Sequence, residues 1–145
     1  MVEGFEEYTK PLEGAIIVSL SKAIIGVLKG SHTGRNRAIT ASAFAKLLTE
    51  FTGREITVRM LRHAISMLRM KGEPICSWGR GYYYMSNDIE MNSTIQSLTD
   101  RMIALAAQVA ALSAKYAELY GNRPVLNFKD LKENIEYLLP IEDED

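Results

Sequence analysis

The sequence of 145 residues contains a single cysteine, Cys76, and only two histidines, His32 and His63. One thiol cannot form a disulfide within the chain, and it indicates a reducing compartment, so we expect a cytoplasmic protein. Neither histidine belongs to a group of His, Cys or carboxylate residues with the spacing of metal ligands. We therefore expect no bound metal.

Sequence motifs for catalysis and cofactor binding are also missing. The chain has no Walker A phosphate loop, no Gly-x-Gly-x-x-Gly dinucleotide pattern and no Gly-x-Ser-x-Gly nucleophile turn. We accordingly expect a protein without enzyme activity, without a cofactor and without a small-molecule ligand.

Long hydrophobic runs are scarce as well. The runs "GAIIVSL" and "AIIGVL" are interrupted by Ser21 and Lys22 and fall short of the ~20 apolar residues that a membrane span needs. Residues 1–14 are acidic, whereas a secretory signal peptide starts with basic residues. We interpret this segment as an N-terminal arm, and we expect no membrane association.

The net charge of −1 conceals an uneven distribution along the chain. Residues 20–85 contain eleven Lys and Arg against three Glu, a balance of +8, so the rest of the chain carries −9. A basic block between acidic ends indicates a polyanionic partner for the middle of the chain. A chance cluster of solvated surface charge is the alternative explanation.

Apolar spacing predicts three helices within this basic block. The first helix covers residues 15–28, Thr40 is the expected N-cap of the second, and Thr57 is the expected N-cap of the third. The signals that end these helices are Gly30, Thr52-Gly53, and Gly72 with Pro74. The expected apolar faces are Ile17, Leu20, Ile24, Val27 and Leu28; Phe44, Leu47, Leu48 and Phe51; and Val58, Leu61, Ile65 and Leu68.

A tight β-hairpin is predicted next, with its tip at Gly79-Arg80-Gly81. The two glycines permit the backbone angles of a narrow turn. Strand alternation gives the hairpin one face toward the core and a second face that is also apolar or aromatic. We expect another element to cover this second face, in preference to stacking of Trp78 on bases. The core face comprises Ile75, Tyr82 and Tyr84, and the second face Cys76, Trp78 and Tyr83.

Three helices followed by a hairpin is the order of elements in a winged helix. Residues 17–86, about half the chain, resemble the winged helix-turn-helix domain at the N-terminus of biotin-operon repressors and of many bacterial and phage regulators. The turn "TGREI" is longer than the usual tight turn, and residues 88–145 have no biotin-ligase character. The matching positions are Leu68-Arg69, Gly72, Pro74-Ile75 and Gly81-Tyr82.

The resemblance implies that the third helix enters the DNA major groove with its N-terminal half first. The side of this helix away from its apolar face carries no acidic residue. Arginine binds guanine bidentately, whereas His and Ser reach base edges or phosphate, and Arg80 at the hairpin tip can reach a phosphate or the minor groove. A solvated helix face is the alternative. The predicted DNA-contacting residues are Thr57, Arg59, Arg62, His63, Ser66, Arg80, and Arg35 and Arg37 from the loop at residues 30–37.

A strict heptad seam follows the hairpin and predicts a long helix. We expect Asn92 or Ser93 to cap this helix, and Gly121 with Pro124 to end it. A dimerising helix is favoured, because a two-fold protein suits two DNA half-sites. Packing on the helix's own domain is the alternative. The seam comprises Ile95, Leu98, Met102, Leu105, Val109, Leu112, Tyr116 and Leu119.

The sequence therefore predicts a mainly α-helical protein with a small β-hairpin wing and a long, coiled-coil-like C-terminal helix. We expect a homodimeric, sequence-specific regulator that binds double-stranded DNA. A DNA-binding protein of replication origins or packaging, and a winged-helix protein-interaction module without DNA binding, are the alternatives. The predicted parts are an acidic arm (1–14), a winged helix (15–87), a long helix (88–121), and a short helix capped by Asn127 with an acidic tail (122–145).

Overall fold

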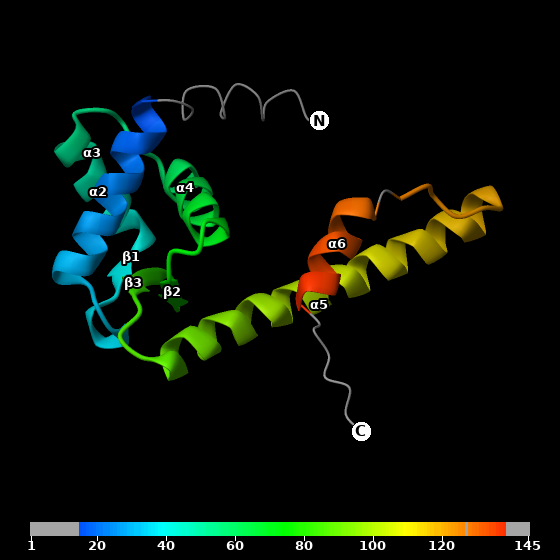
Figure 1. The fold of residues 1–145 in the computed structure, drawn as a ribbon. Helices are drawn as coiled ribbons and strands as arrows, with labels where there is room; N and C mark the ends of the chain where they lie inside the picture. Colours follow the sequence, from blue (N-terminus) through cyan, green and yellow to red (C-terminus); the bar gives the residue numbers. More distant parts are fainter. Residues whose placement is uncertain (1–14, 127, 139–145) are drawn as a thin grey trace. The chain divides into compact units, whose positions relative to one another are not determined.

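The computed structural model describes residues 15–126 and 128–138 (Figure 1). It contains two compact units, of which the first ends at Thr99 and the second begins at Asp100. The expected N-terminal arm, the Asn127 cap and the acidic tail lie outside the described residues. The described part is mainly helical, with one small antiparallel sheet and one long helix.

The order of elements in the first unit follows the sequence prediction, with additions. Three helices, a short 3-10 turn and three strands precede a long helix that continues into the second unit. The elements are α2 (Ala15–Ser31), η1 (Arg35–Arg37), β1 (Ile39–Thr40), α3 (Ala41–Thr52), α4 (Val58–Met70), β2 (Ile75–Trp78), β3 (Gly81–Tyr84), α5 (Asp88–Tyr120) and α6 (Lys129–Leu138).

Two threonines cap α3 and α4, as predicted. The Thr40 hydroxyl accepts a hydrogen bond from the backbone N–H of Ala43 at 3.2 Å, and Thr57 accepts one from Met60 at 3.1 Å. Each hydroxyl satisfies a backbone donor that has no partner within the helix. Gly53, with φ of 72°, ends α3 in the left-handed conformation that favours glycine.

The core of the first unit lies where α2, α3 and α4 meet, and most of the predicted apolar faces point into it. One prediction was wrong: Phe51, expected in the core, is 71% exposed because it stands in the last turn of α3, past the point where the helices converge. Leu47, Val27 and Val58 are half-buried. The buried members are Leu20, Ile24 and Leu28 of α2, Phe44 and Leu48 of α3, and Leu61, Ile65 and Leu68 of α4.

The sheet has three strands rather than the two of the predicted hairpin. Strand β1 pairs antiparallel with β3, which places β3 between β1 and β2. Gly81 is required by this third strand, because a Cβ atom at that position would lie 2.6 Å from the Ile39 carbonyl oxygen. The positive φ of the turn belongs to Gly79 alone, so Gly81 serves close strand packing instead of turn geometry.

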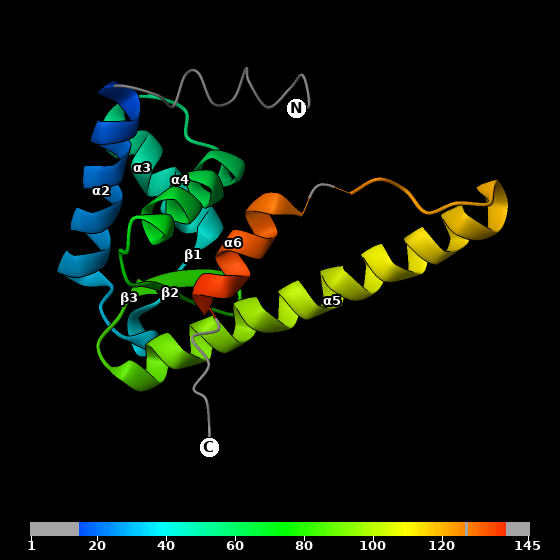
Figure 2. The same cartoon turned by 45° about the vertical axis from the view of Figure 1, so that its right-hand side comes forward.

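The second face of the hairpin is covered, as expected. Tyr83 and Cys76 are buried, whereas Trp78 stays 57% exposed at the edge. The cover comes from η1 and from the first turns of α5, where the buried Thr94 hydroxyl accepts a hydrogen bond from the Ser77 N–H at 3.2 Å. Figure 2 shows these turns of α5 passing below the strands, with the three helices of the core on the other side.

Helix α5 begins earlier than the heptad seam indicated. Asn87, and not Asn92 or Ser93, provides the cap: its side-chain oxygen accepts a hydrogen bond from the Glu90 N–H at 2.9 Å. The expectation was wrong because the turns before Ile95 pack against the sheet, so they follow no coiled-coil pattern. The helix ends at Tyr120, before Gly121, in agreement with the predicted stop.

Candidate nucleic-acid interface

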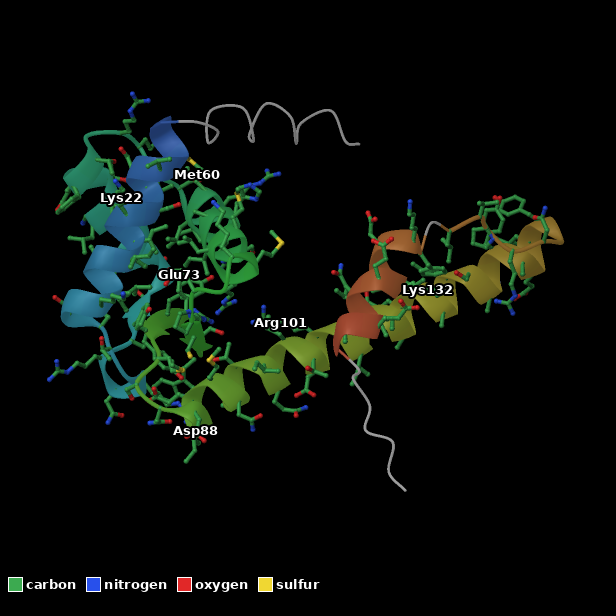
Figure 3. The ribbon with its side chains drawn as sticks, in the orientation of Figure 1. Lys22, Met60, Glu73, Asp88, Arg101 and Lys132 are labelled. Atoms are coloured by element: carbon green, nitrogen blue, oxygen red, sulfur yellow. The ribbon has the colours of Figure 1, made fainter. Side chains whose placement is uncertain are left out.

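Helix α4 has one buried and one exposed side, and the exposed side is basic. Leu61, Ile65 and Leu68 are buried in the core. The helix itself contains no Asp or Glu, and the nearest carboxylate in the sequence belongs to Glu55, two residues before the Thr57 cap. Figure 3 labels Met60, which marks the first turns of this helix.

The turn that leads into α4 is fixed by two threonine hydroxyls of α3. Thr49 Oγ1 accepts a hydrogen bond from the Ile56 N–H at 2.9 Å and donates to the Ala45 carbonyl at 2.9 Å. Thr52 Oγ1 accepts a hydrogen bond from the Arg54 N–H at 3.3 Å. Ile56 itself is buried. The long turn "TGREI" therefore forms a defined connection, and it holds the N-terminus of α4 in a fixed place.

Three of the predicted contact residues lie exposed on α4: Arg59, Arg62 and Ser66. The Arg62 side chain makes no hydrogen bond or ion pair within the described part of the chain, so its five N–H donors are open to a ligand. Thr57 stands at the N-terminus of the same helix, where its hydroxyl already accepts the capping bond.

His63 differs from these neighbours, because it is half-buried. It lines a small crevice between α2 and α4, together with Leu20 and Ser21. The sequence pattern placed His63 beside Arg59 and Arg62, but the structure turns its ring toward α2. His63 is thus poorly placed to reach a base edge.

Arg80 occupies the exposed tip of the β2–β3 hairpin. Its carbonyl oxygen accepts a hydrogen bond from the backbone N–H of Ala41 at 3.0 Å. Its guanidinium makes no hydrogen bond or ion pair with the residues that the structure describes. The backbone of the tip is therefore tied to the first residue of α3, while the cationic end of the side chain points into solvent.

The two arginines of the loop at residues 30–37 have different surroundings. Arg35 is half-buried: Nη2 donates to the Ser93 hydroxyl at 3.1 Å, and the guanidinium lies 5.7 Å from the centre of the Trp78 ring. Arg37 is exposed, and its carbonyl accepts a hydrogen bond from His32 Nδ1 at 2.7 Å. Arg35 thus holds α5 to the sheet, which removes it from the candidate DNA surface, whereas Arg37 stays on it.

Sequence reasoning missed Glu90 and Thr94, the residues that attach α5 to the sheet. Glu90 Oε2 accepts the Arg35 N–H, and Oε1 accepts the Ser86 N–H, both at 2.9 Å. These backbone donors, with Arg35 the larger influence, lower the pKa of the Glu90 carboxyl below its ordinary value of 4.5. The Asn-x-x-Glu spacing of residues 87–90 is the signal of a capping box and would have indicated this helix start.

The heptad seam of α5 is exposed along its whole length. Its leucines are 38–72% exposed, although such side chains are ordinarily buried. Alanines occupy many of the remaining positions, and the ion pair between Lys115 and Glu118 lies near the C-terminal end of the helix. A helix of this composition exposes a large apolar area, which is typical of an interaction surface.

By length and composition alone, α5 is also long and apolar enough to cross a membrane, which is weak evidence for a span. Its uncharged stretch extends from residue 102 to residue 114, because Arg101 and Lys115 flank it. At ~1.5 Å per residue this stretch is about 20 Å long, shorter than the ~30 Å hydrocarbon core of a bilayer.

No protein-family model matches the chain, and neither a curated protein nor a solved structure is significantly similar to it. Among the described residues, no three His, Cys, Asp or Glu side chains gather into a group that could hold a metal ion.

Proposed function

We propose that residues 15–87 form a winged helix-turn-helix domain and that the protein is a sequence-specific regulator that binds double-stranded DNA. The observation that carries this proposal is α4. It is a capped helix with a buried apolar side and an exposed side of Arg59, Arg62 and Ser66, and it has no acidic residue. In a winged helix-turn-helix the corresponding helix enters the major groove, where arginine binds guanine bidentately.

The hairpin supports the same function. In this proposal β2 and β3 are the wing, and Arg80 contacts a phosphate or the minor groove beside the segment that α4 reads. Arg37 adds a further exposed cation from the loop before β1. The surplus of Lys and Arg in residues 20–85 would supply the long-range attraction to DNA that does not depend on base sequence.

Dimerisation through α5 completes the proposal. In heptad terms, Ile95, Met102, Val109 and Tyr116 occupy the a positions, and Leu98, Leu105, Leu112 and Leu119 occupy the d positions. All four d positions are leucine and two of the four a positions, Ile95 and Val109, are β-branched, a combination that favours a parallel two-stranded coiled coil at those layers. Pairing would bury leucines that are exposed in the single chain, at about 25 cal/mol per Å² of apolar surface.

The test is binding of the purified full chain to a pool of random duplexes, with sequencing of the retained fraction and a salt titration. A sequence-reading regulator enriches one motif, ideally two half-sites related by two-fold symmetry, and its affinity falls steeply as salt rises. Binding without enrichment would favour the architectural, replication or packaging role. Absence of duplex binding at low salt would leave only the protein-interaction module.

A further inference from the structure

A groove lies on the first unit between α2, the end of α3 and the turn that leads into α4. It has a volume of about 650 Å³, and its lining is mostly apolar. Leu20 and Ile56 form a buried floor, whereas Phe51 at the rim is 71% exposed. Val18, which directly precedes the groove on α2, is also 54% exposed. Apolar surface of this kind indicates a missing partner.

Two cations stand at this groove, and no acidic residue lines it. Lys22 belongs to α2 and is labelled in Figure 3, and Arg54 belongs to the α3–α4 turn. Both side chains are exposed. A segment that fits here needs apolar side chains for the floor and negative charge for the rim.

Residues 1–14 of the same chain have this chemistry. Their apolar and aromatic side chains include Phe5, Tyr8 and Leu12. The segment contains four glutamates and one lysine, a balance of −3. Pro11 and Gly14 are residues that allow the chain to reverse direction before α2.

The position of the arm in the chain favours the same occupant. Residues 1–14 join α2 at Ala15, one helical turn before Ser19, the first residue that lines the groove. The groove follows α2 from Ser19 to Val27, about 12 Å at ~1.5 Å per residue, which fourteen residues span with ease. A tethered segment also has an effective concentration of about millimolar at such short range.

We propose that residues 1–14 dock in this groove through Phe5 and Tyr8, with their carboxylates near Lys22 and Arg54. Docking covers the Phe51 ring and packs against the turn that positions α4. Because Arg54 precedes the Thr57 cap closely, the docked carboxylates also reduce the positive potential at the N-terminus of α4. This last consequence rests on the proposed DNA binding, whereas the docking itself does not.

The test is methyl NMR of the full chain with the double substitution Phe5→Ser and Tyr8→Ser. Removing two aromatic rings from the groove shifts the methyl signals of Leu20, Val27 and Ile56, and leaves the signal of the distant core residue Ile75 in place. Thr9→Ser, which keeps both aromatic rings and all four carboxylates of the arm, is the matched control and leaves the groove signals unshifted. Groove methyls that do not respond to the double substitution would overturn the proposal.

A second measurement separates the chain's own arm from that of another copy. A spin label is attached at Glu6→Cys; the native Cys76 is buried and does not compete for the label. Broadening of the groove methyls in labelled chains, retained after dilution with unlabelled chains, supports docking within one chain. Broadening seen only when the label and the observed methyls are on different chains would overturn it and make a second copy the occupant.

Discussion

Glu90 and Arg35, 55 residues apart in the sequence, are joined by a hydrogen bond of 2.9 Å from the Arg35 backbone N–H to the Glu90 carboxylate. The same carboxylate accepts the Ser86 N–H, so one side chain connects the loop before β1, the end of the hairpin segment and the first turn of α5. Together with the Thr94 bond to Ser77, this contact fixes the start of α5 on the sheet.

The Glu90 contact predicts how stability depends on pH. Its pKa is lower in the folded state than the ordinary value of 4.5, so its contribution is full above that value and is lost as the pH falls through the folded pKa. Glu90→Gln removes this contribution. Urea denaturation between pH 7 and 3 should show a smaller acid-induced loss for Glu90→Gln than for the native chain. Glu118→Gln, on the exposed side of α5, should retain the native profile.

Arg62→Ala and Arg59→Ala test the reading of DNA sequence. If either side chain binds guanine bidentately, its loss should weaken binding to the selected site by about 1–3 kcal/mol and to random DNA much less. The melting temperature should hardly change, because both side chains are exposed. Arg101→Ala, on α5, is the charge-matched control. An equal loss of affinity for the selected site and for random DNA would mean that this surface binds phosphates without reading the sequence.

Arg80→Ala tests the hairpin tip. A phosphate contact predicts weaker binding to all duplexes to a similar degree, and a salt slope that decreases by about one unit. A changed sequence preference would instead assign Arg80 to the shape of the minor groove. Affinity and slope identical to those of the native chain would mean that the tip has no role in DNA binding.

Leu105→Glu with Leu112→Glu tests the dimer. Charges at two d positions should give monomers in sedimentation velocity at micromolar concentration, where the native chain should be a dimer. Ala107→Glu with Ala114→Glu adds the same charge to the opposite side of α5 and should leave the dimer intact. A native chain that sediments as a monomer would contradict the proposal directly.

Substituting alanine at two glycines should change the stability of the fold in opposite directions. Gly81→Ala should destabilise the fold by about 1–3 kcal/mol, because the new Cβ would collide with the Ile39 carbonyl 2.6 Å away. Gly30→Ala, in the last turn of α2 with no atom within 4 Å of the new Cβ, should stabilise it by about 0.4–1 kcal/mol. Urea denaturation of both variants gives the comparison, and equal effects would contradict the assigned strand contact.

The sequence predicted those parts of the fold that depend on local interactions. Thr40 and Thr57 were identified because a cap requires only a hydroxyl and the next turn of helix. Strand β1 was missed because Ile39 and Thr40 are extended only through their pairing with β3, which no local pattern records. Phe51 has the correct helical spacing for the core, but spacing does not reveal where the neighbouring helices diverge.

The same distinction between local and long-range interactions applies to the candidate site. Arg62 and Arg80 are exposed as predicted, because helix periodicity and a two-glycine turn determine exposure locally. Arg35 was placed with them because its loop carries no periodic signal, and its true partners, Ser93 and Trp78, are distant in the sequence. His63 was expected on the same exposed side of α4 as Arg62. The position of α2 beside it turns the ring away from solvent.

The hydrogen bond between the Ala41 N–H and the Arg80 carbonyl has a consequence for the entropy of binding. A hairpin tip that moves freely in the unbound protein loses backbone freedom when a ligand holds it, at a cost of about 1–2 kcal/mol per residue. In this protein the tip is already attached to α3 before any partner arrives. Only the Arg80 side chain then has to be ordered on contact, so the entropy cost of binding is smaller. More of the attraction between its charge and an anionic partner therefore contributes to the net free energy of binding.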